Sequence, residues 1–171
     1  MTRHSNRIAL AACLFLLAGI LAAKPAGKVS LSVGLEKPEY KLSDKIEIEF
    51  KLVNKGKEPV YVNKRFKLGS AKAAPDQREL IVELKSAEGN PLQMKQMDYD
   101  TGLPKSDYFQ LLQPGEEASA ERKWDLKDLA TIEKPGTYEI TATYQNAFGK
   151  ELGLDVFGEK VTASAKVKVT E

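Results

Sequence analysis

Residues 137–144 read TYEITATY, an unbroken alternation of polar side chains with apolar or aromatic ones. Successive side chains of a β-strand point to opposite faces, so this stretch predicts a strand with one buried and one solvated face. The same alternation recurs at residues 28–33, 45–52, 79–84 and 161–169, and it assigns Glu79 to a solvated face. Clean alternation of this kind is typical of antiparallel sheets. We therefore expect an all-β chain.

Turn residues separate these stretches and set the length of each strand. The turns are expected at Asn54-Lys55-Gly56, Glu88-Gly89-Asn90-Pro91, Gln113-Pro114-Gly115 and Lys134-Pro135-Gly136. They divide the chain into roughly seven or eight short strands, the spacing of a sandwich. One short turn of helix is expected within residues 125–132. With no internal repeat or linker in the sequence, residues 24–171 are expected to form a single domain.

The first 23 residues read as a secretion signal. Arg3 and Arg7 form a basic start, residues 8–22 are an uninterrupted apolar run, and small residues follow. The run is shorter than the roughly 20 residues that span a bilayer as a helix, so we expect cleavage near Ala23 and no stable membrane anchor afterwards. Leu10–Cys13 resembles a lipoprotein cleavage box, but the apolar run continues past the cysteine. The protein is therefore expected to be exported, to the periplasm or the medium.

The only histidine, His4, and the only cysteine, Cys13, both lie inside this signal. Their removal excludes a Ser/His/Asp triad, a thiol nucleophile and any zinc site built on imidazole or thiolate. It also excludes a disulfide. No cofactor is expected, and the domain must be held together by its core alone.

Charge points to no polyanionic partner. The chain has 26 Lys and Arg against 24 Asp and Glu, and removal of Arg3 and Arg7 leaves 24 of each. The positive residues are interleaved with acidic ones and form no stripe. Nucleic acid and anionic membrane surfaces are therefore poor partners.

Pro135-Gly136-Thr137-Tyr138 resembles the tyrosine corner of immunoglobulin-like domains, in which the phenol bonds back to the backbone. Ile140 stands where those domains carry a cysteine. Further motifs follow in order along the chain: Tyr40-x-x-Ser43-Asp44, LVNKGKEPVYV at residues 52–62, Phe109-x-Leu111-x-x-Pro114-Gly115-Glu116, and Trp124-Asp125-Leu126.

This order is similar to the non-catalytic sandwich that precedes deuterolysin-type metalloendopeptidases, and to the small bacterial proteinase-inhibitor sandwich. The resemblance implies an immunoglobulin-like antiparallel β-sandwich without a disulfide. It concerns turns and core, so it implies a fold more than an activity. The His-Glu-x-x-His motif of the peptidase half is absent.

A cluster of carboxylates is the one candidate metal site. Asp98, Asp100 and Asp107 lie at spacings that an oxygen-ligated calcium loop could use. The third acidic position and the distal glutamate of a helical calcium loop are missing. A plain polar loop is therefore the preferred interpretation, and no metal is predicted.

Other polar pairs and the single tryptophan have simple structural explanations. Glu116-Glu117 and Glu47/Glu49 are close enough in sequence to suggest two-carboxylate glycoside hydrolysis, but turn and strand positions favour solvated charge. Trp124 shares its parity with Leu126 and is expected to fill the core. No catalytic residue is predicted.

Residues 145–158 are long for a hairpin connection between two predicted strands. The segment carries Phe148, Leu154 and Phe157 among three glycines, and long connections of rigid sandwiches often bind partners. One interpretation makes these three residues the partner-binding anchors. The other makes the segment an extra hairpin whose side chains complete the core.

These observations favour an exported, non-catalytic binding or accessory module that meets an unknown protein or envelope component. A protease inhibitor is the alternative, and a carboxylate-dependent hydrolase is a weaker third interpretation.

Overall fold

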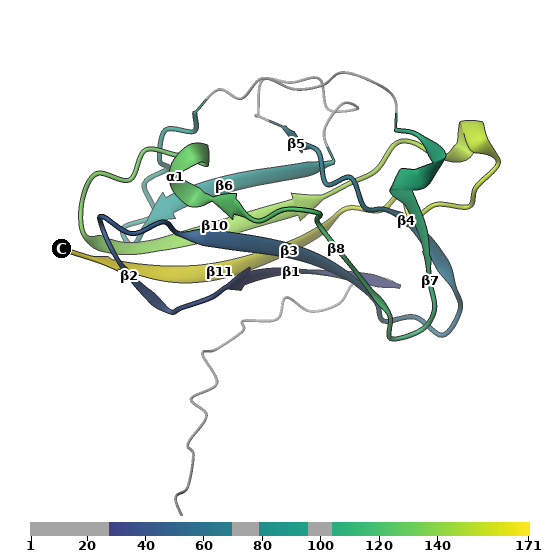
Figure 1. Ribbon diagram of the computed structural model, residues 1–171, viewed down its shortest axis with the longest axis horizontal. Helices are drawn as coiled ribbons and strands as arrows, with labels where there is room; N and C mark the ends of the chain where they lie inside the picture. The colour runs from purple at the N-terminus through teal and green to yellow at the C-terminus, as the bar shows by residue number, and fades with distance from the viewer. Residues whose placement is uncertain (1–27, 70–78, 96–103) are drawn as a thin grey trace, which may run out of the picture.

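The computed structural model describes residues 28–69, 79–95 and 104–171, which form two larger β-sheets packed face to face and a separate two-stranded ribbon (Figure 1). The predicted signal lies outside these residues. Among them, no helix has the length and apolar character needed to cross a membrane.

One sheet is built around β3, which pairs with β1, β8 and β9, and the other has the order β2-β11-β10-β6-β5. A separate ribbon pairs β4 with β7. The strands are β1 (Val29–Leu35), β2 (Glu39–Lys41), β3 (Glu47–Asn54), β4 (Val60–Asn63), β5 (Leu68–Gly69), β6 (Leu80–Ser86), β7 (Phe109–Leu112), β8 (Glu117–Ser119), β9 (Trp124–Asp125), β10 (Gly136–Tyr144) and β11 (Val161–Thr170). The short helices are η2 (Ser106–Tyr108), α1 (Leu126–Leu129) and η3 (Lys150–Leu152).

The all-β sandwich expected from the sequence is confirmed. The five stretches of alternation form β1, β3, β6, β10 and β11, and seven of the described strands are four residues or longer. In immunoglobulin-like domains, strands A, B and E share one sheet, and strands C, F and G share the other. The orders β1-β3-β8 and β11-β10-β6 reproduce that division. Two pairings, β2 with β11 and β5 with β6, are parallel.

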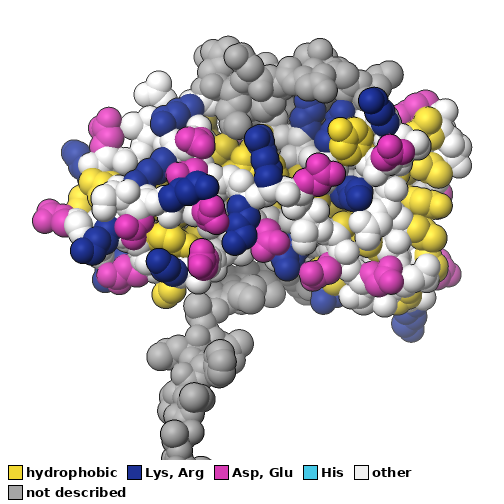
Figure 2. Space-filling view, viewed as in Figure 1, with side chains coloured by type: hydrophobic (Ala, Val, Ile, Leu, Met, Phe, Trp, Pro, Cys, Tyr) yellow, Lys and Arg dark blue, Asp and Glu magenta, His cyan; other side chains and the backbone are white. Residues whose placement is uncertain are grey.

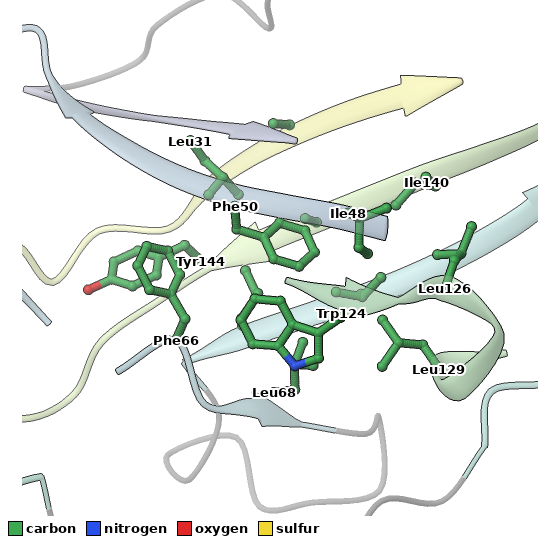
Figure 3. Close-up of a cluster of buried hydrophobic side chains, with 14 of the residues drawn as sticks. Leu31, Ile48, Phe50, Phe66, Leu68, Trp124, Leu126, Leu129, Ile140 and Tyr144 are labelled. Atoms are coloured by element: carbon green, nitrogen blue, oxygen red, sulfur yellow. The ribbon is translucent and has the colours of Figure 1, made fainter. Parts of the chain in front are cut away.

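The core lies between the two sheets and is formed by the alternating apolar residues (Figure 3). Phe50 from β3 packs against Trp124 from β9 with ring centroids 5.3 Å apart, and Ile140 approaches from the opposite sheet. Trp124 is therefore a core residue, as its parity predicts. Burying each large apolar side chain contributes about 1.5–3 kcal/mol, which is how a domain without a disulfide can be stable.

Tyr138, at the start of β10, forms the predicted corner. Its hydroxyl donates a 2.6 Å hydrogen bond to the carbonyl oxygen of Lys134, four residues upstream. Burial, and then the charge of Glu88, raise the pKa of this phenol. The bond ties the turn before β10 to the strand that it introduces.

The predicted helical turn is α1, and Asp125 caps it. The carboxylate accepts hydrogen bonds from the backbone N–H of Lys127 at 3.0 Å and of Ile46 at 3.2 Å. One side chain therefore serves both as the N-cap of the helix and as a link to the start of β3. Leu126 and Leu129 point from the helix into the core (Figure 3).

Candidate functional site

The β4–β7 ribbon carries the most distinctive surface of the described structure. Val60 and Val62 of β4 face the core, so Tyr61 and Asn63 point to the other side of the strand, where Tyr61 is half-buried and Asn63 is fully buried. The end of the 145–158 segment lies along the edge of β4, where the N–H of Phe157 donates to the carbonyl of Tyr61 at 2.8 Å. Val156 consequently lies beside Tyr61 in parallel register, as a one-residue extension of the ribbon.

The 145–158 segment is tightly folded. Gly149 has φ 110°, and its N–H donates to both carboxylate oxygens of Glu151 at 2.9 Å. The carbonyl of Gly149 accepts from the N–H groups of Leu152 and Leu154. A Cβ on Gly149 would lie 2.3 Å from Val156 Cγ2 and 3.0 Å from the Phe109 ring, so only glycine fits there. The segment is thus a packed cap, folded on itself and seated on the ribbon.

A buried polar cluster lies beneath this cap. Glu79 is 0% exposed, and its carboxylate accepts hydrogen bonds from Asn63 Nδ2 at 2.8 Å, from the Lys67 N–H at 2.9 Å and from the Arg65 guanidinium, whose Nε lies 2.9 Å away. Asn63 Nδ2 also donates to Asn146 Oδ1 at 3.1 Å. This polar cluster therefore connects β4 and β6 to the first residues of the 145–158 segment.

Arg65 lies between two aromatic rings. Its guanidinium carbon is 5.7 Å from the Tyr108 ring centroid and 5.8 Å from that of Phe148, and its side chain is only 12% exposed. Cation–π contact of this kind adds to the pairing with Glu79. Phe148 is thereby fixed over the arginine, and its carbonyl accepts a 2.7 Å hydrogen bond from Asn146 Nδ2.

The burial of Glu79 corrects the sequence prediction that this residue faces solvent. Strand parity does point it away from the main core, but the polar cluster and the 145–158 segment enclose that side of β6. A buried carboxylate is tolerated here because a cation and several N–H donors surround it. Asn63, Arg65 and Glu79 were not among the candidate residues, since nothing in their spacing marks them as neighbours.

The outer surface of the ribbon and its cap is apolar. We call Tyr61, Leu111, Leu152, Leu154 and Val156 the outer face. Leu111 and Leu152 are the exposed large apolar residues of the described structure, at 40% and 45%, and the other three are half-buried. Figure 2 shows apolar side chains gathered at the right-hand end of the molecule, where Figure 1 draws β4 and β7. Exposed apolar side chains that adjoin one another mark interaction sites more often than scattered ones do.

The three predicted partner-binding anchors occupy different environments. Phe157 is 6% exposed and belongs to the core, so the prediction that it is an exposed anchor is wrong; its backbone bond to Tyr61 turns the ring inward. Phe148 is half-buried over Arg65, and Leu154 is half-buried on the outer face.

Of the carboxylates considered for calcium, Asp98 and Asp100 lie outside the described residues. Asp107 lies in η2, where its Oδ1 accepts a 3.2 Å hydrogen bond from Ser106 Oγ. Within residues 28–69, 79–95 and 104–171, no three His, Cys, Asp or Glu side chains group in a way that could hold a metal ion.

The paired carboxylates are engaged with neighbouring lysines and backbone. Glu47 pairs with Lys45 at 2.7 Å and with Lys123 at 3.6 Å, and the hydrogen bond from Lys45 lowers the pKa of its carboxyl. Glu117 lies 3.3 Å from Lys51, and Glu116 accepts from the Gln113 N–H at 2.8 Å. These pairings fit the solvated-charge interpretation.

No family model matches the chain, and no curated protein matches it. Among solved structures, the chain is similar to a β-glucosidase from Erythrobacter marinus at 15% identity and a TM-score of 0.37. The match covers 83% of this chain and 15% of the length of that protein. At this TM-score the likeness bears neither on the fold nor on the activity.

Proposed function

We propose that the protein is an exported, non-catalytic binding or accessory module, and that it contacts a protein or envelope component through the outer face. The observation that carries the proposal is the row formed by Leu111, Tyr61 and Val156, which lie side by side on adjacent strands. Leu152, in η3 of the cap, is exposed as well.

A rigid apolar surface suits binding because little conformational entropy is lost when the partner docks. The outer face stands on two paired strands and on a cap fixed by Gly149 and by the polar cluster. Tyr61 supplies an aromatic ring of the kind that is enriched at interface centres. These features support recognition by a preformed surface rather than by a loop that orders on binding.

The absence of catalytic machinery is part of the proposal. Residues 24–171 contain no histidine or cysteine, and the carboxylate pairs singled out in the sequence are engaged in surface ion pairs or backbone hydrogen bonds. The basic start and the apolar run of residues 1–23 support export. The compartment that follows is the periplasm or the medium.

A capture experiment tests the proposal. The processed chain would be immobilised and exposed to envelope extract and culture medium, alongside a Leu111→Ser/Leu152→Ser variant and a Lys166→Ser control on the opposite sheet. Wild type and control should retain the same partner, and the double variant should lose it with an unchanged melting temperature. Equal retention by all three proteins would overturn the assignment of the outer face.

The identity and chemistry of the captured partner separate the remaining interpretations. A captured protease that loses activity on binding would favour the inhibitor alternative. Turnover in a screen of glycan substrates would favour the hydrolase and contradict the non-catalytic assignment.

A further inference from the structure

We propose that the free edge of β7 binds an extended, uncharged peptide segment of the partner and adds it to the β4–β7 ribbon as a further strand. This inference rests on the proposed function and specifies the kind of partner. It follows from the hydrogen-bond parity of the ribbon, from the charge of its edge and from what already occupies its opposite edge.

One bond just outside the strands shows which residue pairs of the ribbon are hydrogen-bonded. Asn63 lies directly opposite Phe109, and the N–H of the next residue, Lys64, donates to the carbonyl of Tyr108, so Asn63 and Phe109 form a non-hydrogen-bonded pair. In an antiparallel pair, hydrogen-bonded and non-hydrogen-bonded pairs alternate. Tyr61 and Leu111 therefore form a non-hydrogen-bonded pair, whose backbone groups point away from each other.

Three outward backbone groups of β4 have partners. The carbonyl of Tyr61 accepts from the Phe157 N–H, and both backbone groups of Asn63 bond to the Tyr144 hydroxyl. On β7, the N–H of Phe109 donates to the carbonyl of Ser106. Within the described part of the chain, the N–H and C=O of Leu111 have no hydrogen-bond partner, so Leu111 offers one donor and one acceptor at the edge of β7.

The charge of this edge specifies the occupant further. Residues 108–115, Tyr-Phe-Gln-Leu-Leu-Gln-Pro-Gly, contain no charged side chain. Of the other edge strands, β2 and β8 carry Glu39, Lys41 and Glu117, the kind of charge that discourages strand addition, whereas β1 and β5 carry no charge. A charged segment on β7 would lose hydration without gaining an ion pair, so an uncharged strand fits best.

The opposite edge of the ribbon, on β4, already binds an extended segment. There the chain's own extended residues 155–157 lie along β4, held by one backbone bond and by the apolar contact of Val156. A partner strand on β7 would extend the same small sheet. A second copy of the chain is a poorer occupant, because a four-residue edge falls far short of the roughly 800 Å² per partner of a stable interface.

The test uses the processed chain labelled with ¹⁵N and a synthetic probe, the capped hexapeptide Thr-Val-Thr-Val-Thr-Val. Strand addition should shift the Leu111 amide resonance and slow its hydrogen exchange by tenfold or more. A probe N-methylated on alternate residues, which cannot supply the edge hydrogen bonds, should bind about tenfold more weakly. The inference would be overturned if the unmodified hexapeptide does not bind, or if both peptides bind equally well.

Two variants of Leu111 separate the role of its backbone N–H from that of its side chain. Leu111→Ala removes the side chain and keeps the N–H, whereas Leu111→Pro removes both. The proline should be tolerated, because this N–H forms no hydrogen bond within the described structure. Strand addition predicts that proline weakens binding of the hexapeptide about tenfold more than alanine does. If both variants reduce partner capture equally, the outer face binds without the edge; that result overturns this inference and leaves the proposed function standing. Self-association of the peptide-free chain with a protected Leu111 amide would instead make a second copy the occupant.

Discussion

The hydroxyl of Tyr144 forms the two backbone hydrogen bonds that a neighbouring strand would otherwise form with Asn63. It accepts from the Asn63 N–H and donates to the Asn63 carbonyl, each at 3.1 Å, at the point where β4 ends. A side chain from the second sheet thus satisfies two buried backbone groups that no strand reaches. The same asparagine donates from its own side chain to Glu79, so the last residue of β4 joins the β4–β7 ribbon to β10 and to the polar cluster.

The Tyr144 phenol should make stability fall at alkaline pH. Burial raises its pKa well above the ordinary 10.0, so the folded state keeps a proton that the unfolded state loses. The unfolded state then binds fewer protons, and the free energy of unfolding declines as pH rises past about 10, by at most about 1.4 kcal/mol per pH unit for one group. Denaturant midpoints measured from about pH 9 to about pH 11 would follow this decline. The slope should be shallower in Tyr144→Phe, and parallel slopes would contradict the assignment.

Tyr138→Phe should cost about 1–3 kcal/mol, because it removes the corner hydrogen bond to Lys134 and leaves that carbonyl without it. The ring stays, so the strand still packs. Tyr61→Phe is the matched control, since none of the hydrogen bonds seen in the described residues involves its hydroxyl. Urea midpoints of the two variants should differ clearly; equal midpoints would mean that the corner bond contributes nothing.

Glu79→Ala should destabilise the protein by about 3–5 kcal/mol, because it leaves the buried Arg65 guanidinium without its carboxylate. Glu39 pairs with Lys168 at 2.9 Å on the surface, and Glu39→Ala should cost less than about 1 kcal/mol. Chemical denaturation measures both. A small loss at Glu79 would show that the polar cluster reorganises around the missing carboxylate.

Phe157→Ala should cost about 3–5 kcal/mol, as expected for truncation of a buried aromatic side chain. Leu154→Ser, three residues earlier on the outer face, should change stability by no more than about 1 kcal/mol. Thermal unfolding of the two variants checks the difference. Similar losses at both positions would place Leu154 in the core as well.

Gly149→Ala should displace the cap from the ribbon. The added methyl group would collide with Val156, and the positive φ is strained for alanine. Gly153→Ala is the control, because φ is also positive there but the site is open, so only backbone strain of about 1–2 kcal/mol applies. Hydrogen exchange of the Phe157 amide should accelerate in the first variant and stay near the wild-type rate in the second.

The alternating strands were predictable because the buried face of each strand is formed by every second residue of a short stretch of sequence. The turns, the short helix at Asp125 and the Tyr138 corner were predictable for the same reason: their partners lie within a few residues. The polar cluster was not, because it joins Asn63 to Asn146, which are 83 residues apart, and because parity alone exposes Glu79. The inward turn of Phe157 likewise depends on a distant strand, β4.

The parallel pairing of β2 with β11 has a mechanical consequence. The N–H of Lys168 donates to the carbonyl of Pro38, and the N–H of Leu42 donates to the carbonyl of Thr170. Backbone hydrogen bonds therefore hold β2 to β11 at both ends of the short strand. Tension between the start of β2 and the end of β11 would draw the two strands in opposite directions along their length. These bonds would then carry the load together in shear, instead of opening one after another like a zipper, and the domain would resist being pulled apart through this pair of strands.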